Sequence, residues 1–256
     1  MTDDPLFQFL IDEAGKPFSG WDFSYIEGTG RISHAPLAWS YVSIILPKVR
    51  RAGSLLDMGT GGGELLSMLQ PLPRHTCATE GYEPNIPIAR RRLGPLGVQV
   101  YALTEEDRLP LPDATFDLVI NRHESYAPEE VLRVLKPGGE FVTQQVGGSD
   151  MLDFNRLLGA EPDFGYSHWT LDFARKQLET AGFEIIEARQ DFPITRIFDV
   201  GAVVYYLKAI PWQIEDFSVE KYFDKLAELH QTIQRQGYVD VRSDRFLLAA
   251  RKGGAA

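Results

Sequence analysis

The residues best suited to chemistry are an acid and a group of glycines in segment 55–64, which reads LLDMGTGGGE. Two apolar residues lead into Asp57, and four of the six residues after it are glycine. This pattern predicts a buried strand over 54–57, a tight turn, and a helix over 63–69. Glycines in such a turn let a nucleotide-like ligand lie directly against main-chain N–H groups.

The spacing of the glycines separates this loop from two common phosphate-binding loops. A dinucleotide-binding loop follows G-x-G-x-x-G, and Glu64 stands where its third glycine should be. The P-loop pattern is also absent, because no Gly-Lys-Ser or Gly-Lys-Thr follows the glycines. Asp57 would repel a pyrophosphate, but it would suit a ligand with an ammonium group and a sulfonium charge. S-adenosylmethionine carries both charges and no phosphate.

Short apolar segments alternate with helical patterns from residue 53 onward. This alternation predicts an α/β fold with a doubly wound, mostly parallel sheet of seven strands, the last of them antiparallel. Strands are expected at 54–57, 75–80, 98–102, 116–120, 140–146, 183–188 and 245–250. Helices of this domain are expected at 63–69, 85–93, 129–135 and 171–181.

Further motifs follow the glycine loop in a fixed order. Glu80 ends the second expected strand, and Pro84 then leads into the helix that contains Ile88-Ala89-Arg90. Segment 109–119 contains Leu-Pro-Leu-Pro-Asp before Phe-Asp-Leu-Val, and segment 131–139 reads VLRVLKPGG. In this order and spacing the motifs resemble those of class I (Rossmann-like) S-adenosylmethionine-dependent methyltransferases, over roughly residues 50–190.

The resemblance implies a role for each residue that matches a family motif. Asp57 would lie near the methionine end of the cofactor, Glu80 would accept hydrogen bonds from the ribose hydroxyls, and Gly81 and Tyr82 would flank the adenine. One departure is the segment 104–108, whose acids replace the usual Gly-Asp-Ala type, so the adenine contact falls on Glu105, Glu106 or Asp107. The expected cofactor-binding residues are Asp57, Gly59, Thr60, Gly61, Gly63, Glu80, Gly81, Tyr82, Glu105, Glu106, Asn121 and Arg122.

The residues after the fourth strand would lie beside the transferring methyl group. A base is needed only where the acceptor must lose a proton, and His123 is the first candidate because imidazole titrates near neutral pH. His168 is the second, although it could also be part of a helix cap. The family's adenine-type nucleic-acid enzymes have Asn-Pro-Pro-Tyr where this chain has Asn-Arg-His-Glu at 121–124. Segment 144–148 would border the acceptor pocket.

The chain is expected to have four parts. Residues 1–50 form an N-terminal helical cap with a helix over 36–49, and residues 51–192 form the Rossmann-like domain, which residues 241–256 complete. Residues 193–240 are too long for a simple sheet connection, so we expect a helical insertion, or lid, with helices over 200–210 and 219–235. Its apolar residues either line a lid over an organic acceptor or pack onto the core: Val203, Val204, Tyr205, Tyr206, Ile210, Trp212 and Phe217.

Composition limits the classes of partner. The net charge of −10 argues against a nucleic-acid partner, and the run Arg90–Arg92 reads as a solvated helix face. The single cysteine, Cys77, excludes an internal disulfide framework and a cysteine-rich metal site, and it is expected to be buried. The N-terminus lacks a signal-peptide pattern and no apolar run approaches the roughly 20 residues of a membrane span, so we expect a cytoplasmic protein without a membrane partner.

The sequence favours a methyltransferase that acts on a small molecule, with S-adenosylmethionine as cofactor and no metal. An RNA or protein methyltransferase remains an alternative, as does a protein that binds the cofactor without catalysis. A nicotinamide-dependent oxidoreductase is disfavoured by Glu64. The acceptor, the atom that is methylated and the oligomeric state do not follow from the sequence.

Overall fold

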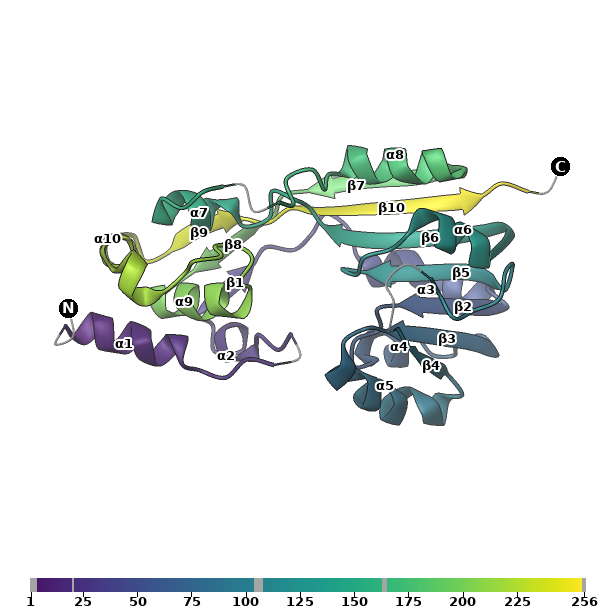
Figure 1. Cartoon of the computed structure of the whole chain (residues 1–256), viewed down its shortest axis with the longest axis horizontal. Coiled ribbons are helices and arrows are strands. Elements are labelled where there is room, and N and C mark those ends of the chain that lie inside the picture. The colour runs from purple at the N-terminus through teal and green to yellow at the C-terminus, as the bar shows by residue number, and fades with distance from the viewer. Residues whose placement is uncertain (1–3, 20, 104–107, 163–164, 255–256) are drawn as a thin grey trace. The chain divides into compact units, whose positions relative to one another are not determined.

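The computed structural model describes residues 4–19, 21–103, 108–162 and 165–254 (Figure 1). The chain divides into two compact units, each built from three segments. The Rossmann-like unit consists of Ala38–Val146, Trp169–Gln190 and Arg245–Ala256. The accessory unit consists of Met1–Leu37, Gly147–His168 and Asp191–Asp244.

A sheet of seven strands forms the Rossmann-like unit among the described residues, in the order β4-β3-β2-β5-β6-β10-β7. The strands from β4 to β6 pair in parallel, and β10 is antiparallel to β6, which confirms the predicted fold class. All five residues of β2 are buried, as expected of a central strand covered on both faces. The strands are β2 (Ser54–Met58), β3 (His75–Glu80), β4 (Gln99–Ala102), β5 (Phe116–Arg122), β6 (Leu135–Val146), β7 (Phe183–Asp191) and β10 (Arg245–Lys252).

The strand order reverses between β2 and β5, since β3 and β4 extend the sheet on one side and β5 and β6 on the other. In open α/β sheets, ligands bind at this switch point, outside the carboxyl ends of the strands. The glycine loop follows β2 and segment 121–124 follows the body of β5. The fold therefore brings the two segments that carry the chemistry to one place.

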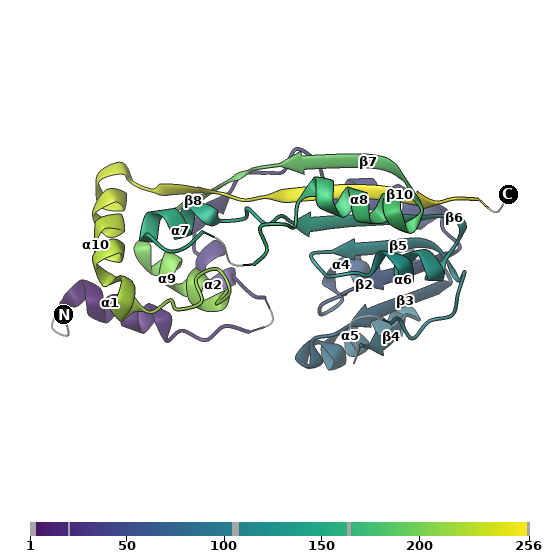
Figure 2. The ribbon, with the colours of Figure 1, turned by 45° about the horizontal axis from the view of Figure 1, so that its top comes forward.

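Helices cover the sheet of this unit. Figure 2 shows α6 and α8 together on one face, where they contact each other. Helix α8 has the predicted bounds: Thr170 caps it by accepting a hydrogen bond from Phe173 N–H at 3.2 Å, and Gly182, with φ of 103°, ends it. The helices are α3 (Tyr41–Arg51), α4 (Glu64–Met68), α5 (Ile86–Leu93), α6 (Pro128–Val134) and α8 (Leu171–Ala181), with short 3-10 turns η1 (Glu83–Asn85) and η2 (Gly94–Leu96).

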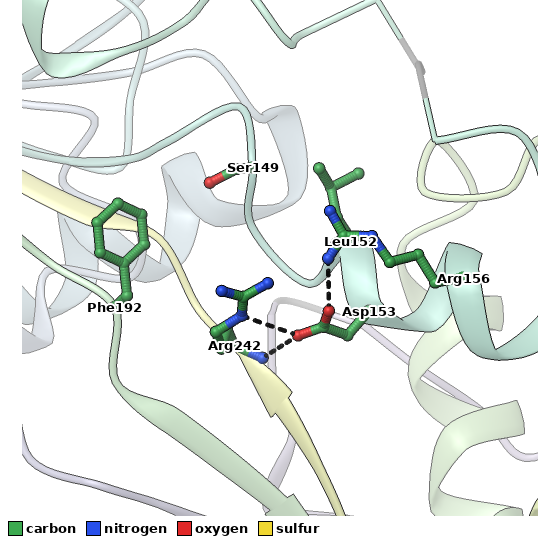
Figure 3. A pocket seen from close by; sticks show the side chains of 6 residues that line it. All are labelled: Ser149, Leu152, Asp153, Arg156, Phe192 and Arg242. Atoms are coloured by element: carbon green, nitrogen blue, oxygen red, sulfur yellow. Dashed lines mark hydrogen bonds and ion pairs between the residues drawn. The ribbon is translucent and has the colours of Figure 1, made fainter.

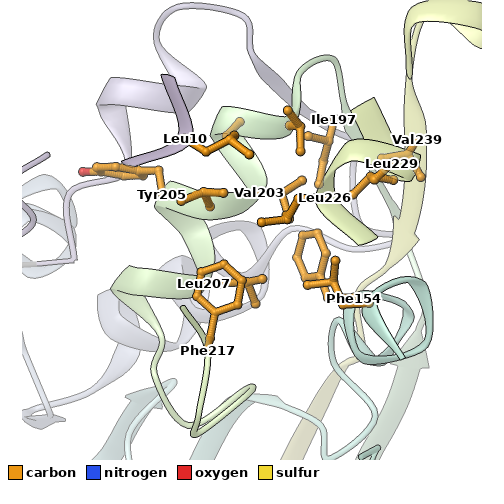
Figure 4. Packing of buried hydrophobic residues seen from close by; sticks show 14 of the residues in the cluster. Leu10, Phe154, Ile197, Val203, Tyr205, Leu207, Phe217, Leu226, Leu229 and Val239 are labelled. Atoms are coloured by element: carbon orange, nitrogen blue, oxygen red, sulfur yellow. The ribbon is translucent and has the colours of Figure 1, made fainter. Parts of the chain in front are cut away.

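The accessory unit combines helices with an antiparallel sheet of three strands, in the order β1-β8-β9. Its own hydrophobic core lies among α1, α9, α10 and the sheet, as the side chains in Figure 4 show. The strands are β1 (Ile32–His34), β8 (Ile194–Ile197) and β9 (Val239–Arg242). The helices are α1 (Pro5–Ala14), α2 (Ser24–Glu27), α7 (Leu152–Leu158), α9 (Val200–Ala209) and α10 (Val219–Gln236).

Several expectations for this region need correction. The segment 193–240 is not purely helical, because it contains β8 and the start of β9. The pairing of β8 with β1 joins residues that are far apart in the sequence, so no local pattern announces it. The units also differ from the expected domains, because α3 belongs to the Rossmann-like unit and residues 147–168 belong to the accessory unit.

Most apolar residues that were candidates for a lid pack into a core instead. Val203 and Val204 are fully buried, and Tyr205 is 3% exposed, in the core of the accessory unit itself. Trp212 is the exception: it is 40% exposed and its ring lies 5.6 Å from that of Trp21. Packing onto a core, the second of the two interpretations, is therefore correct for α9.

Three smaller expectations are testable in the same structure. Arg90, Arg91 and Arg92 are all exposed on α5, which confirms a solvated helix face. Cys77 is buried in β3, as predicted. Over the described part of the chain, no helix combines the length and apolar character that crossing a membrane requires.

Candidate cofactor site

The loop after β2 is held in a conformation that glycine favours. Gly59, Gly61 and Gly63 have φ values of 67°, 62° and 82°, in the left-handed region. The backbone N–H of Thr60 donates to the carbonyl oxygen of Thr79 at 2.9 Å, which ties the loop to β3. A Cβ on Gly61 would meet no atom within 4 Å, so the space over this residue is open.

Asp57 lies buried beneath the loop, at 5% exposure. Its carboxylate accepts a hydrogen bond from the Thr60 hydroxyl at 2.7 Å. Burial raises the pKa of Asp57 to about 7, the Thr60 hydrogen bond opposes this, and the negative charge of Glu80 adds to it. A carboxylate that is costly to bury favours a cationic ligand beside it.

Glu80 ends β3 and is 3% exposed. Its two carboxylate oxygens accept backbone hydrogen bonds, Oε2 from Gly61 N–H at 2.6 Å and Oε1 from Tyr82 N–H at 2.7 Å. Burial raises the pKa of Glu80, these backbone hydrogen bonds lower it, and the charge of Glu124 raises it again. Each oxygen keeps a further lone pair, so a braced carboxylate of this kind can still accept hydrogen bonds from a ligand.

The end of β5 lies directly beside the glycine loop, because Asn121 pairs with Met58 of β2. Asn121 is fully buried, and its Oδ1 accepts hydrogen bonds from the Thr143 hydroxyl at 2.8 Å and from Gln145 Nε2 at 2.7 Å. Its Nδ2 is buried without a partner. Burying an amide N–H without a hydrogen-bond acceptor costs free energy, so a bound ligand or water would supply the acceptor here.

Glu124 is a member of this site that the sequence reasoning did not assign. A Cβ on Gly59 would overlap the Glu124 side chain, so the two residues touch. Its charge also raises the pKa of Glu80. The signal was present in the sequence as an acid in segment 121–124, but only the fold puts that acid over the glycine loop.

The residues fit S-adenosylmethionine better than a phosphate-bearing cofactor. Asp57, Glu80 and Glu124 gather at one loop, and like charges would repel a pyrophosphate. An open glycine backbone and a braced carboxylate suit a ligand that carries hydroxyls and positive charge. Across the residues for which side chains are described, no cluster of His, Cys, Asp and Glu is suited to a metal ion.

The other expected site residues are distributed as follows. Gly81 and Tyr82 are exposed next to Glu80, and Arg122 is exposed at the end of β5. Glu105, Glu106 and Asp107 lie outside the described residues. His168 belongs to the accessory unit, and segment 144–148 is divided between β6 and that unit. The binding roles of all these residues remain predictions.

His123 follows β5 with a φ of 60°, an uncommon value for a residue with a side chain. Its backbone N–H donates to the carbonyl oxygen of Gln144 at 2.8 Å, and its Nε2 lies 3.1 Å from Gln144 Nε2. The surrounding protein atoms, together with the charges of Arg245 and Arg122, lower the pKa of His123 to about 3. The residue is nevertheless exposed to solvent.

The accessory unit has a small pocket of its own, which is not part of the cofactor site described above. Figure 3 shows Asp153 between two arginines, with its oxygens 2.7 Å from Arg156 Nη1 and 3.3 Å from Arg242 Nε. The guanidinium groups are thus already paired with a carboxylate, and we assign the pocket no ligand. Its lining consists of Ser149, Leu152, Asp153, Arg156, Phe192 and Arg242.

The two glycines at the start of the loop should respond differently to alanine. Gly59→Ala and Gly61→Ala each place a side chain at a positive φ, which costs about 1 kcal/mol. Gly59→Ala also overlaps Glu124, so we expect a further loss of about 1–3 kcal/mol in the free energy of unfolding, measured in urea. Gly61→Ala is the matched control, and equal losses for both variants would contradict the close contact at Gly59.

Comparisons with known proteins relate part of the Rossmann-like unit to methyltransferases. Residues 56–143 match the family model of a methyltransferase domain. A ubiquinone/menaquinone biosynthesis C-methyltransferase of Hydrogenovibrio crunogenus is 31% identical over 117 residues, 41% of this chain and 46% of that relative. A protein-L-isoaspartate O-methyltransferase of Pelodictyon phaeoclathratiforme is 26% identical over 151 residues, 56% of this chain and 68% of the relative.

A solved structure extends the likeness in fold. A Bacillus halodurans protein assigned to the methyltransferases superposes with a TM-score of 0.59 at 21% identity, over 84% of this chain and 100% of that one. Identity this low shows a shared fold alone, and the match to the first relative spans about half of that relative's length. The glycine loop and the acid that ends β3 lie inside the matched segment: residues 56–143 match a methyltransferase domain, and the unit shares the fold of class I methyltransferases.

Proposed function

We propose that this protein binds S-adenosylmethionine at the carboxyl ends of β2, β3 and β5 and transfers its methyl group to a small-molecule acceptor. The observation that carries the proposal is the open backbone at Gly61, with Glu80 hydrogen-bonded to that backbone and Asp57 buried beneath it. These groups match the charges and hydroxyls of the cofactor. They do not match a pyrophosphate.

Each residue would then have a distinct task. Asp57 would attract the ammonium group of the methionine portion, and Glu80 would accept hydrogen bonds from the ribose hydroxyls. Asn121 Nδ2, a buried donor without a partner, would donate to an oxygen of the cofactor or the acceptor. Tyr82, which is 49% exposed, would lie along the adenine.

The bound cofactor supplies an electrophilic methyl group on sulfur, and the protein supplies alignment. The acceptor must approach in line with the bond that breaks, so fixed positions for both molecules account for most of the rate enhancement. Segment 121–124 is anchored for this purpose, because Asn121 is fixed by Thr143 and Gln145 and because His123 N–H is bonded to Gln144.

A small-molecule acceptor is favoured over RNA by the net charge of −10. One of the relatives named above is a protein-L-isoaspartate O-methyltransferase, so a protein acceptor is the second candidate.

Calorimetry and a labelling experiment test both parts of the proposal. The full chain should bind S-adenosylmethionine and S-adenosylhomocysteine but not NAD, and NAD binding alone would overturn the assignment of the site. The protein is then incubated with methyl-labelled cofactor and a cell extract that is separated into small molecules, protein and RNA. Label in the small-molecule fraction supports the proposal, and label confined to protein or RNA would overturn the acceptor class.

A further inference from the structure

We propose that Gln144 and Trp39 hold His123 as the neutral tautomer with its proton on Nδ1, so that His123 serves the acceptor as a hydrogen-bond donor and not as a general base. The inference rests on the proposed function and assigns a chemistry to one residue of the same site. It also replaces the expectation that His123 is a base. All three residues belong to the Rossmann-like unit.

The Gln144 amide has a defined orientation. Trp39 Nε1 lies 2.9 Å from Gln144 Oε1, and both residues are buried, at 8% and 3% exposure. An indole N–H can only donate a hydrogen bond, so the amide must present its oxygen to Trp39. The amide nitrogen then faces His123, which removes the usual ambiguity between the two ends of a glutamine side chain.

The orientation of Gln144 determines which nitrogen of the His123 imidazole carries the proton. Gln144 Nε2 lies 3.1 Å from His123 Nε2, and an amide nitrogen can only donate. His123 Nε2 must therefore accept through its lone pair, and the single proton of the neutral ring lies on Nδ1. Protonation of Nε2 would set two N–H groups against each other, so the imidazolium form is disfavoured.

The two arginines near His123 also favour the neutral imidazole over the imidazolium. Its own charged neighbour Arg122 and Arg245 of β10 both disfavour a positive ring, whereas the adjacent Glu124 would favour one. The φ of 60° and the backbone bond to the Gln144 carbonyl oxygen fix the residue where it stands. Strain maintained in this way is a common property of functional positions.

The Nδ1–H group is the part of the ring that remains for a ligand. Among the described residues no hydrogen bond involves His123 Nδ1, and the residue is exposed to solvent. A donor at this position selects an acceptor molecule with a carbonyl, carboxylate or phenolate oxygen. His123 then removes no proton from the acceptor, so it suits an acceptor that is already nucleophilic, for example a carboxylate, thiolate, enolate or free amine.

Nitrogen NMR of the histidine side chains tests the tautomer without any need for turnover. In long-range ¹⁵N–¹H spectra of the labelled full chain, the signal lost in His123→Asn identifies His123 among the five histidines. We expect a protonated Nδ1, an unprotonated Nε2, and no titration between about pH 5 and 8. An Nε2–H tautomer, or titration near pH 6.5, would overturn the inference.

Two variants test whether the hydrogen-bonded chain Trp39–Gln144–His123 sets the tautomer or has a merely structural role. Gln144→Glu turns the partner of Nε2 into an acceptor, so the proton should move to Nε2 and the pKa of His123 should rise by more than about one unit. Trp39→Phe removes the group that orients the amide and should give a mixture of tautomers. An unchanged His123 spectrum in Gln144→Glu would overturn the inference.

Kinetics give the functional readout once an acceptor is known. Asparagine tolerates a positive φ and retains an N–H donor, so His123→Asn should keep much of kcat, whereas His123→Leu should lose it. The pH profile of kcat/KM should be the same in wild type and His123→Asn, and an ionisation present only in wild type would identify a base. If the wild-type protein does not bind S-adenosylmethionine, the proposed function is refuted. The NMR spectra would still decide the tautomer of His123.

Discussion

Replacing Asp57 by asparagine should weaken S-adenosylmethionine binding by about 100-fold and make the ligand-free protein more stable. The affinity falls because a charge-assisted hydrogen bond, which contributes about 2–3 kcal/mol, is lost. Stability rises because Asp57 has a pKa of about 7 in the folded protein and 3.8 in the unfolded chain. Its ionisation therefore costs the fold up to about 4 kcal/mol at high pH.

The free energy of unfolding should decrease with rising pH because of Asp57. Between pH 3.8 and about 7 the folded protein retains a proton on Asp57 that the unfolded chain has lost, so the contribution of Asp57 to stability falls as pH rises. Urea unfolding at pH 5 and pH 8 should show this fall in wild type and not in Asp57→Asn. Cofactor affinity should show the opposite trend and strengthen from pH 5.5 to 7, because only the ionised carboxylate attracts a cation.

Asp172→Asn is a matched control for Asp57→Asn, since the Asp172 side chain lies on α8 and is 87% exposed. Calorimetry should find its cofactor affinity equal to that of wild type. An unchanged dissociation constant in Asp57→Asn would mean that the cofactor binds elsewhere. Unchanged stability with weakened binding would mean only that Asp57 is better solvated than its burial suggests.

Replacing Glu80 by alanine should produce the second large effect, a loss of cofactor affinity of about 100-fold or more. Two hydrogen bonds from the ribose to a charged acceptor would disappear, each a contribution of about 1.5–3 kcal/mol. The loop would also lose its brace, because Glu80 holds Gly61 N–H and Tyr82 N–H. Glu83→Ala, at a nearby exposed acid, serves as the control.

A double-mutant cycle separates recognition of the ribose from bracing of the loop. The affinities of wild type and Glu80→Ala are measured for S-adenosylhomocysteine and for its 2′-deoxy analogue. If Glu80 accepts a hydrogen bond from the ribose, the analogue should lose affinity for wild type but little for the variant. Equal losses for both proteins would leave Glu80 with a role in the loop alone.

Local sequence determined much of the Rossmann-like unit because its elements carry their own boundaries. Helix α8 spans residues 171–181 as predicted and ends at Gly182, and β2 is an apolar run closed by a glycine turn. The acids at the ends of β2 and β3, Asp57 and Glu80, were singled out because they match motifs of the family that the chain resembles, and parallel strands present such residues at one edge of the sheet. The accessory sheet escaped prediction because β8 and β9 are four residues long and β8 also pairs with a distant segment, β1.

The sequence by itself therefore identified the methyltransferase motifs and the glycine loop at which we propose that the methyl donor binds, because glycine spacing and flanking acids are local chemical requirements. Only the tertiary structure decided which side chains surround that loop and how their environment affects protonation. Glu124 reaches Gly59, and Trp39 orients Gln144 against His123, through contacts between residues distant in the chain. The position of the proton on an imidazole depends on such neighbours, so the sequence led to the prediction of a base at His123, whereas the contacts in the fold lead us to propose a hydrogen-bond donor.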